Sequence, residues 1–472
     1  MIHEGMPTAG RVWLRRGLCT VAGAVTALSL AVAPAAAAKP GPGHTLSPTT
    51  RFAQRKPDHA ALQQVALLRS SGDHTDANRI SAMINTPQAD WLDGGTPHQV
   101  RQQVDQVVKQ AAAKGTVPVL VMYNVPGRDC SQYSAGGAGS DAAYRAWVDG
   151  AVSGLGAAHA VVIVEPDGLA NLPSDCASAY PGQDVNALTA ARIADIAYAG
   201  EQIETSDPNS LVYLDAGHSA WHSAADMAKR LYEAGVGNLQ GFFLDVSNYQ
   251  YTANSSYYGT WLSDCLAYAT PLNSSHTAVV PGDYGNCGDE YYNGGPATNW
   301  AGGPMNPYGV WTPNNSDLTL NTSGVDSRYA LELGSVQPVV HFVVDTSRNG
   351  NGPNDMSAYA AAPYNQPPDV IHGLQAGNWC NPPGAVLGPR PEALPAPNTF
   401  PLLDAYLWVK TPGESDGQCN IAGGARAWDY SAYNPMNWDA TQQQQNDPLW
   451  AMQDPAAGAW FDQQALQLVR NG

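Results

Sequence analysis

"VVIVEPDGLANL", residues 161–172, begins with four branched apolar residues and then brings two acids, Glu165 and Asp167, directly after them. An apolar run of this kind is typical of a strand that is buried on both faces of a parallel sheet. Burying a carboxylate is costly unless the group is paired or neutralised. Two acids at the end of such a strand therefore indicate a functional site.

The apolar runs along the chain predict the fold class. Between most of them lie Ala-rich segments with helical spacing, at 141–155, 186–204 and 219–234. Strands that alternate with helices predict a parallel sheet covered on both faces, either a barrel or a doubly wound sheet, and seven strands favour the barrel. The predicted strands are 80–84, 117–125, 160–164, 211–214, 241–246, 339–344 and 405–409.

The first 38 residues have the pattern of an export signal. Arg11, Arg15 and Arg16 precede an apolar stretch at 18–32, and small residues follow up to Lys39. The twin-arginine and general export routes both stay open, and a retained membrane anchor is the less favoured alternative. Residues 39–472 suffice for one large domain or two ordinary ones.

The charge of the chain excludes some partners. The leader carries three Arg and one Glu, so its removal takes away +2 and changes the formal charge from −18 to −20. Such acidity disfavours binding to nucleic acid and to anionic membranes. A neutral substrate is compatible with it.

The cysteines predict disulfides. The chain has seven cysteines, of which Cys19 is removed with the leader. The remaining six are an even number, which in an exported chain favours disulfides. Six cysteines allow fifteen connectivities. There is no C-x-x-C pair, so a structural zinc site is not expected. We predict that neighbours in the sequence pair, as Cys130–Cys176, Cys265–Cys287 and Cys380–Cys419.

Acids recur at or just beyond the ends of the predicted strands. In a parallel barrel these ends share one face, where active sites lie. Aspartates are also common turn formers, which is the alternative for any one of them. Neighbouring acids repel, so at least one should hold its proton, and a protonated acid beside ionised ones is the equipment of glycoside hydrolysis. The acids are Asp129, Asp167, Asp215, Asp245, Asp345 and Asp416.

Two other motifs suggest different chemistry. "GESDG" at 413–417 matches the G-x-S-x-G serine elbow, but the last histidine, His372, precedes it, whereas that fold needs one after the serine. His218 and His222, with Asp215, have a spacing suited to a metal, but no third clear ligand accompanies them. Neither reading is favoured, and we expect no metal.

Two stretches, 249–335 and 417–455, interrupt the alternation of strands and helices. Both are rich in Asn, Gly and aromatic residues. We expect them to be long loops without regular structure of their own, and such loops are usually functional.

Several motifs in order resemble one known family. They are "YNVPGRDC", "VVIVEPDGLANL", "YLDAGHSAWH", "NYQ" after a strand, "DTSRNG", "GNWCNPPG" and "WVKTPGESDG". Their order and spacing are similar to those of glycoside hydrolase family 6, over nearly the whole chain from about Trp91 onward. The resemblance implies a single catalytic domain at 39–472, an α/β fold with a distorted β/α barrel of about seven parallel strands, and an active site under long loops.

The resemblance also implies inverting hydrolysis of β-1,4-glucan without a cofactor. Asp167 would be the general acid, and Asp129 would raise the pKa of that acid and help to handle water. Asp416 is the position usually proposed as the base, although a water chain to a more distant carboxylate is the alternative. The disulfide Cys130–Cys176 would brace the loops that carry the first two acids.

Other positions match the substrate-binding residues of the family. Tyr123 would press on the distorted sugar, and three tryptophans would stack on sugar rings. The sequence departs from the family pattern at two places. Asp245 stands where the family commonly has Asn, which is expected to add a charge near the site. The loop "CSQYSAGGAGS" lacks the usual Ser-Asn-Gly-Glu motif, and Ser134 is expected to take the role of its serine. The implied binding residues are Tyr123, Trp91, Trp221, Trp379, Ser134, Asn248, Asp215, His218, Lys410 and Glu414.

The long loops favour one subtype within the family. We predict a secreted, monomeric, exo-acting cellobiohydrolase that releases cellobiose from non-reducing ends, because extended loops roof the cleft in such enzymes. An endoglucanase is the alternative, and a non-catalytic glucan-binding protein is a third reading that retention of all three acids disfavours. The expected partners are cellulose and cello-oligosaccharides.

Overall fold

The computed structural model describes residues 45–362, 364–420 and 438–472. By its internal contacts the chain divides into Met1–Ala37 and Ala38–Gly472. The predicted signal at 1–38 lies outside the described residues, so it and the single-domain boundary stay predictions. No helix in the described part combines the length and the apolar character that crossing a membrane requires.

The core of the fold is an eight-stranded sheet with the order β1-β2-β3-β4-β5-β6-β8-β7. Neighbouring strands from β1 to β8 are parallel, and only the short β7 runs antiparallel to β8. The strands are β1 Asp90–Leu92, β2 Val119–Met122, β3 Val161–Val164, β4 Leu211–Asp215, β5 Gly241–Leu244, β6 His341–Asp345, β7 Glu392–Ala393 and β8 Leu403–Leu407.

The sheet curls into a distorted barrel, as predicted. No ladder joins β1 to β8 in the described sheet, but the amide of Ala89 donates to the carbonyl of Trp408 at 3.0 Å, and the Trp91 indole donates to Val409 at 2.9 Å. These two contacts bring the edges of the sheet together. They lie where the predicted site residues of β1 and of the chain after β8 meet.

Side chains alternate between the barrel interior and the helix layer. Val119 and Val121 of β2 lie in the interior cluster, whereas Leu120 and Met122 pack toward the surrounding helices. This alternation follows from the two-residue period of a strand. It explains why the strands are apolar throughout, since both faces are covered.

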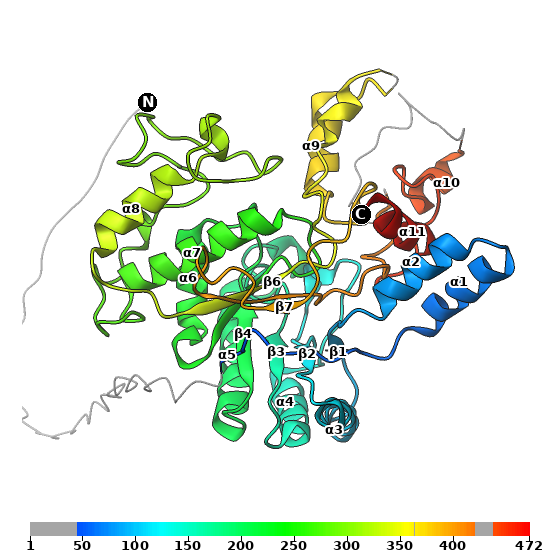
Figure 1. Cartoon of the computed structure of the whole chain (residues 1–472), viewed down its shortest axis with the longest axis horizontal. Helices are drawn as coiled ribbons and strands as arrows, with labels where there is room; N and C mark the ends of the chain where they lie inside the picture. The colour runs from blue at the N-terminus through cyan, green and yellow to red at the C-terminus, as the bar shows by residue number, and fades with distance from the viewer. Residues whose placement is uncertain (1–44, 363, 421–437) are drawn as a thin grey trace, which may run out of the picture. The chain divides into compact units, whose positions relative to one another are not determined.

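The helices surround the sheet, and Figure 1 shows α3, α4 and α5 side by side along strands β1 to β4. The predicted helix at 141–155 is confirmed, and its N-terminus is capped by the Ser140 hydroxyl. The helices are α1 His59–Ser70, α2 His74–Ile84, α3 Pro97–Lys114, α4 Asp141–Leu155, α5 Val185–Ser206, α6 Ala224–Glu233, α7 Thr252–Ala269, α8 Ser323–Leu333, α9 Pro368–Ala376, α10 Ala440–Gln445 and α11 Asp462–Asn471.

The prediction of a strand at 80–84 is wrong, because these residues end helix α2. Asp73 caps this helix, and Ile80, Met83 and Ile84 form one buried stripe at helical spacing. A short apolar run does not by itself distinguish a strand from a buried helix. The true first strand, β1, has three residues and escaped notice.

The expectation of structureless loops at 249–335 is also wrong. Helix α7 fills the first part of this stretch and is almost completely buried, and α8 fills the last part. The disulfide Cys265–Cys287 joins α7 to the segment between the two helices. The other two predicted disulfides, Cys130–Cys176 and Cys380–Cys419, are also confirmed.

Candidate active site

Glu165, at the end of β3, binds the loop that follows the adjacent strand β2. Its side chain is fully buried, and its carboxylate accepts the backbone amides of Asn124 at 2.9 Å and Val125 at 3.0 Å. Burial raises the pKa of Glu165 to about 7, although these amides oppose the rise. Glu165 thus fixes the start of the loop after β2, which carries Asp129.

Asp215 at the end of β4 does the same for the loop after β3. Its Oδ2 accepts the amides of Leu169 at 3.0 Å and Ala170 at 2.7 Å, and its Oδ1 accepts Gly217 at 3.1 Å. The side chain is only 2% exposed. Asp215 therefore fixes the loop that carries Asp167.

Asp345 at the end of β6 completes the pattern. Its carboxylate accepts the amides of Val409 at 3.1 Å and Lys410 at 2.9 Å, at the start of the segment that leads to Asp416. We call Glu165, Asp215 and Asp345 the clamp carboxylates, because each fixes the loop of an adjacent strand. The sequence pattern places acids at the strand ends but does not distinguish clamps from reacting groups.

Asp245 at the end of β5 is buried and accepts the amide of Gln250 and the side-chain amide of Asn349, both at 3.1 Å. Burial raises its pKa well above the usual value, and Asp345 adds to the rise. The bonds from Gln250 and Asn349 and the charge of Arg348 oppose this rise. The expectation that Asp245 adds a charge near the site stays a prediction.

Asp167 lies in the loop that Asp215 fixes, half-buried and with a left-handed backbone at φ 63°. Such a conformation is strained for a residue with a side chain and is often found at active sites. Burial raises the pKa of Asp167 well above its usual value, and the charges of Asp215, Asp129 and Asp416 raise it further. Three of the predicted acids thus favour the protonated form of Asp167.

Asp129 is held by Ser134 in the same loop. The amide and the hydroxyl of Ser134 both donate to Asp129 Oδ2 at 2.8 Å, and the same hydroxyl lies 2.9 Å from the Tyr123 hydroxyl. Burial raises the pKa of Asp129, although the bonds from Ser134 oppose the rise. Trp91 meets the Tyr123 ring edge-on at a centroid distance of 5.3 Å.

Asp416 differs from the other acids of the site because it forms ion pairs with two cations. Arg348 contacts both of its oxygens at 2.9 Å, Tyr249 donates to it at 2.8 Å, and Lys410 lies 3.7 Å away. The amide of Asn381 adds a bond at 3.0 Å. Burial acts to raise the pKa of Asp416, but Arg348 and Lys410 hold it below the usual value. Asp416 is therefore ionised and a weak proton acceptor.

Three further predicted binding residues, His218, Trp221 and Trp379, lie in two different segments of the chain. His218 and Trp221 follow β4, with ring centroids 5.4 Å apart, and burial lowers the pKa of His218 to about 3. Trp379 lies beside the Cys380–Cys419 disulfide, and its ring centroid is 6.2 Å from that of Tyr133. Their contact with substrate stays a prediction.

Two predicted polar residues already have protein partners. The side-chain amide of Asn248 donates to the Val246 carbonyl at 3.1 Å, and Glu414 pairs with Arg55 at 3.1 Å. Arg55 precedes the first helix, so this pair links the start of the described chain to the site. A substrate hydroxyl would have to share or replace these contacts.

The sequence analysis named Glu165 as an acid of a functional site but did not predict that it binds backbone amides, and it missed the residues that hold Asp416 in place. Arg348, Tyr249 and Asn381 all lie inside motifs quoted for the resemblance, in "DTSRNG", "NYQ" and "GNWCNPPG". An arginine in a motif that follows a buried strand was a usable signal, because a buried guanidinium needs an anionic partner. Arg55 carried no comparable signal.

The structure gives no support to the serine elbow. Ser415 is buried, and its hydroxyl bonds to the carbonyls of Pro455 at 2.9 Å and Gly417 at 3.0 Å. His222 is likewise engaged at both ring nitrogens, with Ala170 at 2.6 Å and Asp226 at 3.2 Å. A zinc ion would have to displace these partners.

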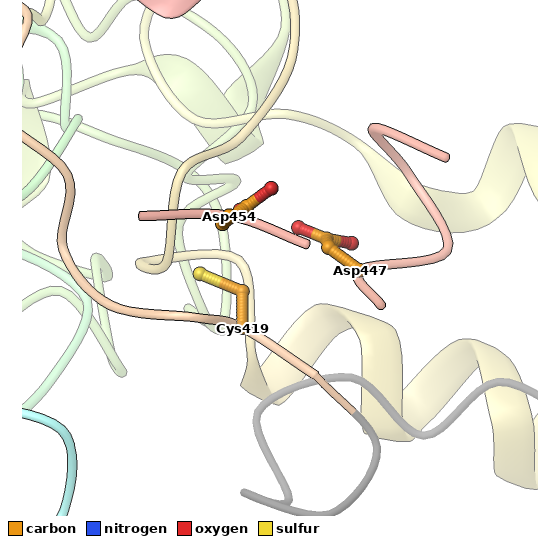
Figure 2. A group of neighbouring side chains, drawn as sticks. All are labelled: Cys419, Asp447 and Asp454. Atoms are coloured by element: carbon orange, nitrogen blue, oxygen red, sulfur yellow. The ribbon is translucent and has the colours of Figure 1, made fainter. Parts of the chain in front are cut away.

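Of the His, Cys, Asp and Glu side chains within the described residues, one trio lies close enough to surround an ion. Figure 2 shows Cys419, Asp447 and Asp454, whose candidate ligand atoms lie within 4.8 Å of one another. Because Cys419 is bonded to Cys380, it cannot supply a thiolate. Two carboxylates remain, which is too few for a defined metal site.

The geometry defines a class of protein before any comparison. An acid with a raised pKa and a carboxylate with a lowered pKa, both at the C-terminal ends of barrel strands, form the arrangement that a glycoside hydrolase requires. The chain belongs to the Glycosyl hydrolases family 6, which matches residues 47–472. The resemblance seen in the motifs is thereby confirmed.

Relatives with both modes of action are similar to this chain. Endoglucanase 1 of Streptomyces halstedii is 31% identical over 417 residues, which cover 88% of this chain and 95% of the relative. Exoglucanase A of Cellulomonas fimi is 27% identical, and the match covers 93% of this chain but only 49% of that longer protein.

A solved structure supports the same assignment. The endoglucanase Cel6 from Mycobacterium tuberculosis, in complex with methyl-cellobiosyl-4-deoxy-4-thio-β-D-cellobioside, is 29% identical with a TM-score of 0.55. The match covers 89% of this chain and 97% of that one. The fold and the family therefore agree.

The pairing of Arg348 with Asp416 yields a prediction about stability. Replacing Arg348 by Met leaves a buried carboxylate short of its main partner, which costs about 3–5 kcal/mol. The double variant Arg348→Met/Asp416→Asn should recover part of this loss. Urea denaturation of the two variants measures both effects.

The exposed pair Lys109–Asp105 supplies the control for this experiment. The variant Lys109→Met should cost less than about 1 kcal/mol, because exposed ion pairs contribute little. A loss for Arg348→Met as small as that of the control would show that the buried pair does not hold the site together.

Proposed function

We propose that this protein hydrolyses β-1,4-glucan with inversion and that Asp167 is the general acid. The observation that carries the proposal is the position of Asp167 after β3, in the loop that Asp215 fixes, where burial and the charges of Asp215, Asp129 and Asp416 raise its pKa. An acid that keeps its proton can donate it to the glycosidic oxygen as the bond breaks. Family membership and the cello-oligosaccharide analogue bound in the similar endoglucanase support the substrate class.

Asp129 and Asp416 complete the proposed machinery. Asp129 lies close enough to raise the pKa of Asp167 and holds Ser134, which in turn contacts Tyr123. Asp416 is ionised and can receive the proton of the attacking water. Its pairing with Arg348 weakens its basicity, so the alternative of a water chain to another carboxylate is retained.

The substrate is proposed to lie along the aromatic residues of this face. Tyr123 would press on the sugar at the cleavage point, and its position beside Trp91 and Ser134 suits that role. Trp91, Trp221 and Trp379 would stack on the apolar faces of pyranose rings. The predicted contacts of Ser134, Asn248, Asp215, His218, Lys410 and Glu414 with sugar hydroxyls belong to the same proposal.

The proposed setting is extracellular. Three disulfides fit an oxidising compartment, and they agree with the export signal predicted for residues 1–38. We propose a secreted monomer that acts on cellulose and cello-oligosaccharides. Binding to nucleic acid or membranes is not part of this proposal.

The mode of attack has two candidates. The exo-acting mode was predicted from two long loops, but one of these contains α7 and α8, and residues 421–437 of the other lie outside the described part. The endo-acting mode is supported by the name of the Streptomyces halstedii relative, and the exo-acting mode by that of exoglucanase A.

The substitution Asp167→Asn tests the acid. We expect activity on β-1,4-glucan to fall by about 10² to 10⁴-fold, because the amide keeps the shape but cannot donate the proton. Oligosaccharide binding should change little. Asp105→Asn on the exposed face of α3 is the matched control, and activity of Asp167→Asn within tenfold of the unsubstituted protein would refute the assignment.

The pH profile provides a second readout for the same group. Because the protonated form is the active one, activity should decline as the pH rises through the raised pKa of Asp167. This decline should be absent from the residual activity of Asp167→Asn.

Product analysis on swollen cellulose separates the two modes. The exo-acting mode predicts mainly soluble cellobiose and little loss of carboxymethyl cellulose viscosity. Rapid viscosity loss with new reducing ends in the insoluble fraction would instead establish the endo-acting mode.

A further inference from the structure

Two exposed tyrosines lie beside the predicted sugar platform Trp221. Tyr291 and Tyr292 are 46% and 50% exposed, among the most exposed large side chains of the described residues. The Tyr291 hydroxyl lies 3.4 Å from the carbonyl oxygen of Trp221. Both belong to the segment between α7 and α8, and we call residues 289–292 the tyrosine turn.

The tyrosine turn is held in a defined conformation. Asp289 Oδ1 accepts the amides of Tyr291 at 2.9 Å and Tyr292 at 3.2 Å. The Tyr292 ring packs over Gly302, where a Cβ atom would approach the ring to 2.6 Å. The disulfide Cys265–Cys287 anchors the chain just before the turn. Rings fixed in this way lose little conformational entropy when a ligand covers them.

The tyrosine turn is connected, through Trp221 and His222, to the loop that carries Asp167. The rings of Trp221 and His222 stack at a centroid distance of 5.7 Å and an interplanar angle of 16°. The Nε2 atom of His222 lies 2.6 Å from the carbonyl oxygen of Ala170, in the loop that carries Asp167. The tyrosine turn therefore lies beside a residue that is linked to the loop carrying Asp167.

We propose that Tyr291 and Tyr292 form an additional sugar-binding subsite, which extends the cleft beyond Trp221 and binds further glucosyl units of a long β-glucan chain. This inference rests on the proposed function of the site. A pyranose presents an apolar face that suits an exposed aromatic ring. Asp289, whose carboxylate accepts two backbone amides, lies beside the rings and disfavours an anionic ligand, whereas a neutral sugar is compatible with it.

The chemistry of the hydroxyl groups agrees with this ligand. Burial raises the pKa of Tyr291 to about 12, and the neighbouring Glu290 and Asp289 add to the rise. The phenol therefore stays neutral, and its oxygen can accept a hydrogen bond from a sugar hydroxyl while it donates to the Trp221 carbonyl oxygen. Stacking and hydrogen bonding are then available on the same residue.

The test compares oligosaccharides of different length. Calorimetric titration of cellotetraose and cellohexaose into Asp167→Asn gives affinities under conditions where hydrolysis is slow. Adding Tyr291→Ala and Tyr292→Ala should weaken cellohexaose binding by roughly five- to tenfold, the size expected of a stacking contact, and leave cellotetraose binding unchanged.

Two further variants serve as controls. Replacing both tyrosines by Phe keeps the rings and should restore most of the affinity, whereas Tyr232→Ala, at a similarly exposed tyrosine near the end of α6, should have no effect. Equal losses for both oligosaccharides, or no loss, would overturn the additional subsite alone. No binding of cellotetraose before the tyrosines are changed would refute the proposed function and the subsite together.

Discussion

The site depends on hydrogen bonds between buried carboxylates and the backbone amides of neighbouring loops. Glu165 binds the loop after β2, Asp215 binds the loop after β3, and Asp345 binds the segment after β8. A buried carboxylate is costly without partners, and each charge-assisted bond returns about 1.5–3 kcal/mol. These bonds hold the loops that carry Asp129, Asp167 and Asp416 in a defined conformation.

This arrangement separates the acids into two groups with different tasks. The clamp carboxylates lie at the ends of the strands and take backbone amides, whereas Asp129, Asp167 and Asp416 lie in the loops that are fixed. Asp215 belongs to the first group by its bonds, yet its charge also raises the pKa of Asp167. The opposite environment of Asp416, paired with Arg348, lowers its pKa. One network therefore produces both a proton-retaining acid and an ionised carboxylate.

The sequence predicted the barrel, the three disulfides and the face of the site, because strand composition, cysteine order and acids after strands are local patterns. It mistook 80–84 for a strand, since an apolar run of five residues fits a buried helix equally well. The pattern of acids after strands could not by itself separate Asp215 from Asp167, which only the family resemblance did, because that difference depends on which loop lies opposite. The pairing of Arg348 with Asp416 joins residues 68 positions apart and required the folded structure.

The most direct measurement is amide hydrogen exchange in Asp215→Ala. If the clamp carboxylates fix the loops, the amides of Leu169 and Ala170 should exchange at least about tenfold faster than in the unsubstituted protein, as expected from losing charge-assisted hydrogen bonds. The core of α4 should remain protected, which shows that the fold is intact. Unchanged exchange at these two amides would contradict the account, because the loop that carries Asp167 would then be held by other contacts.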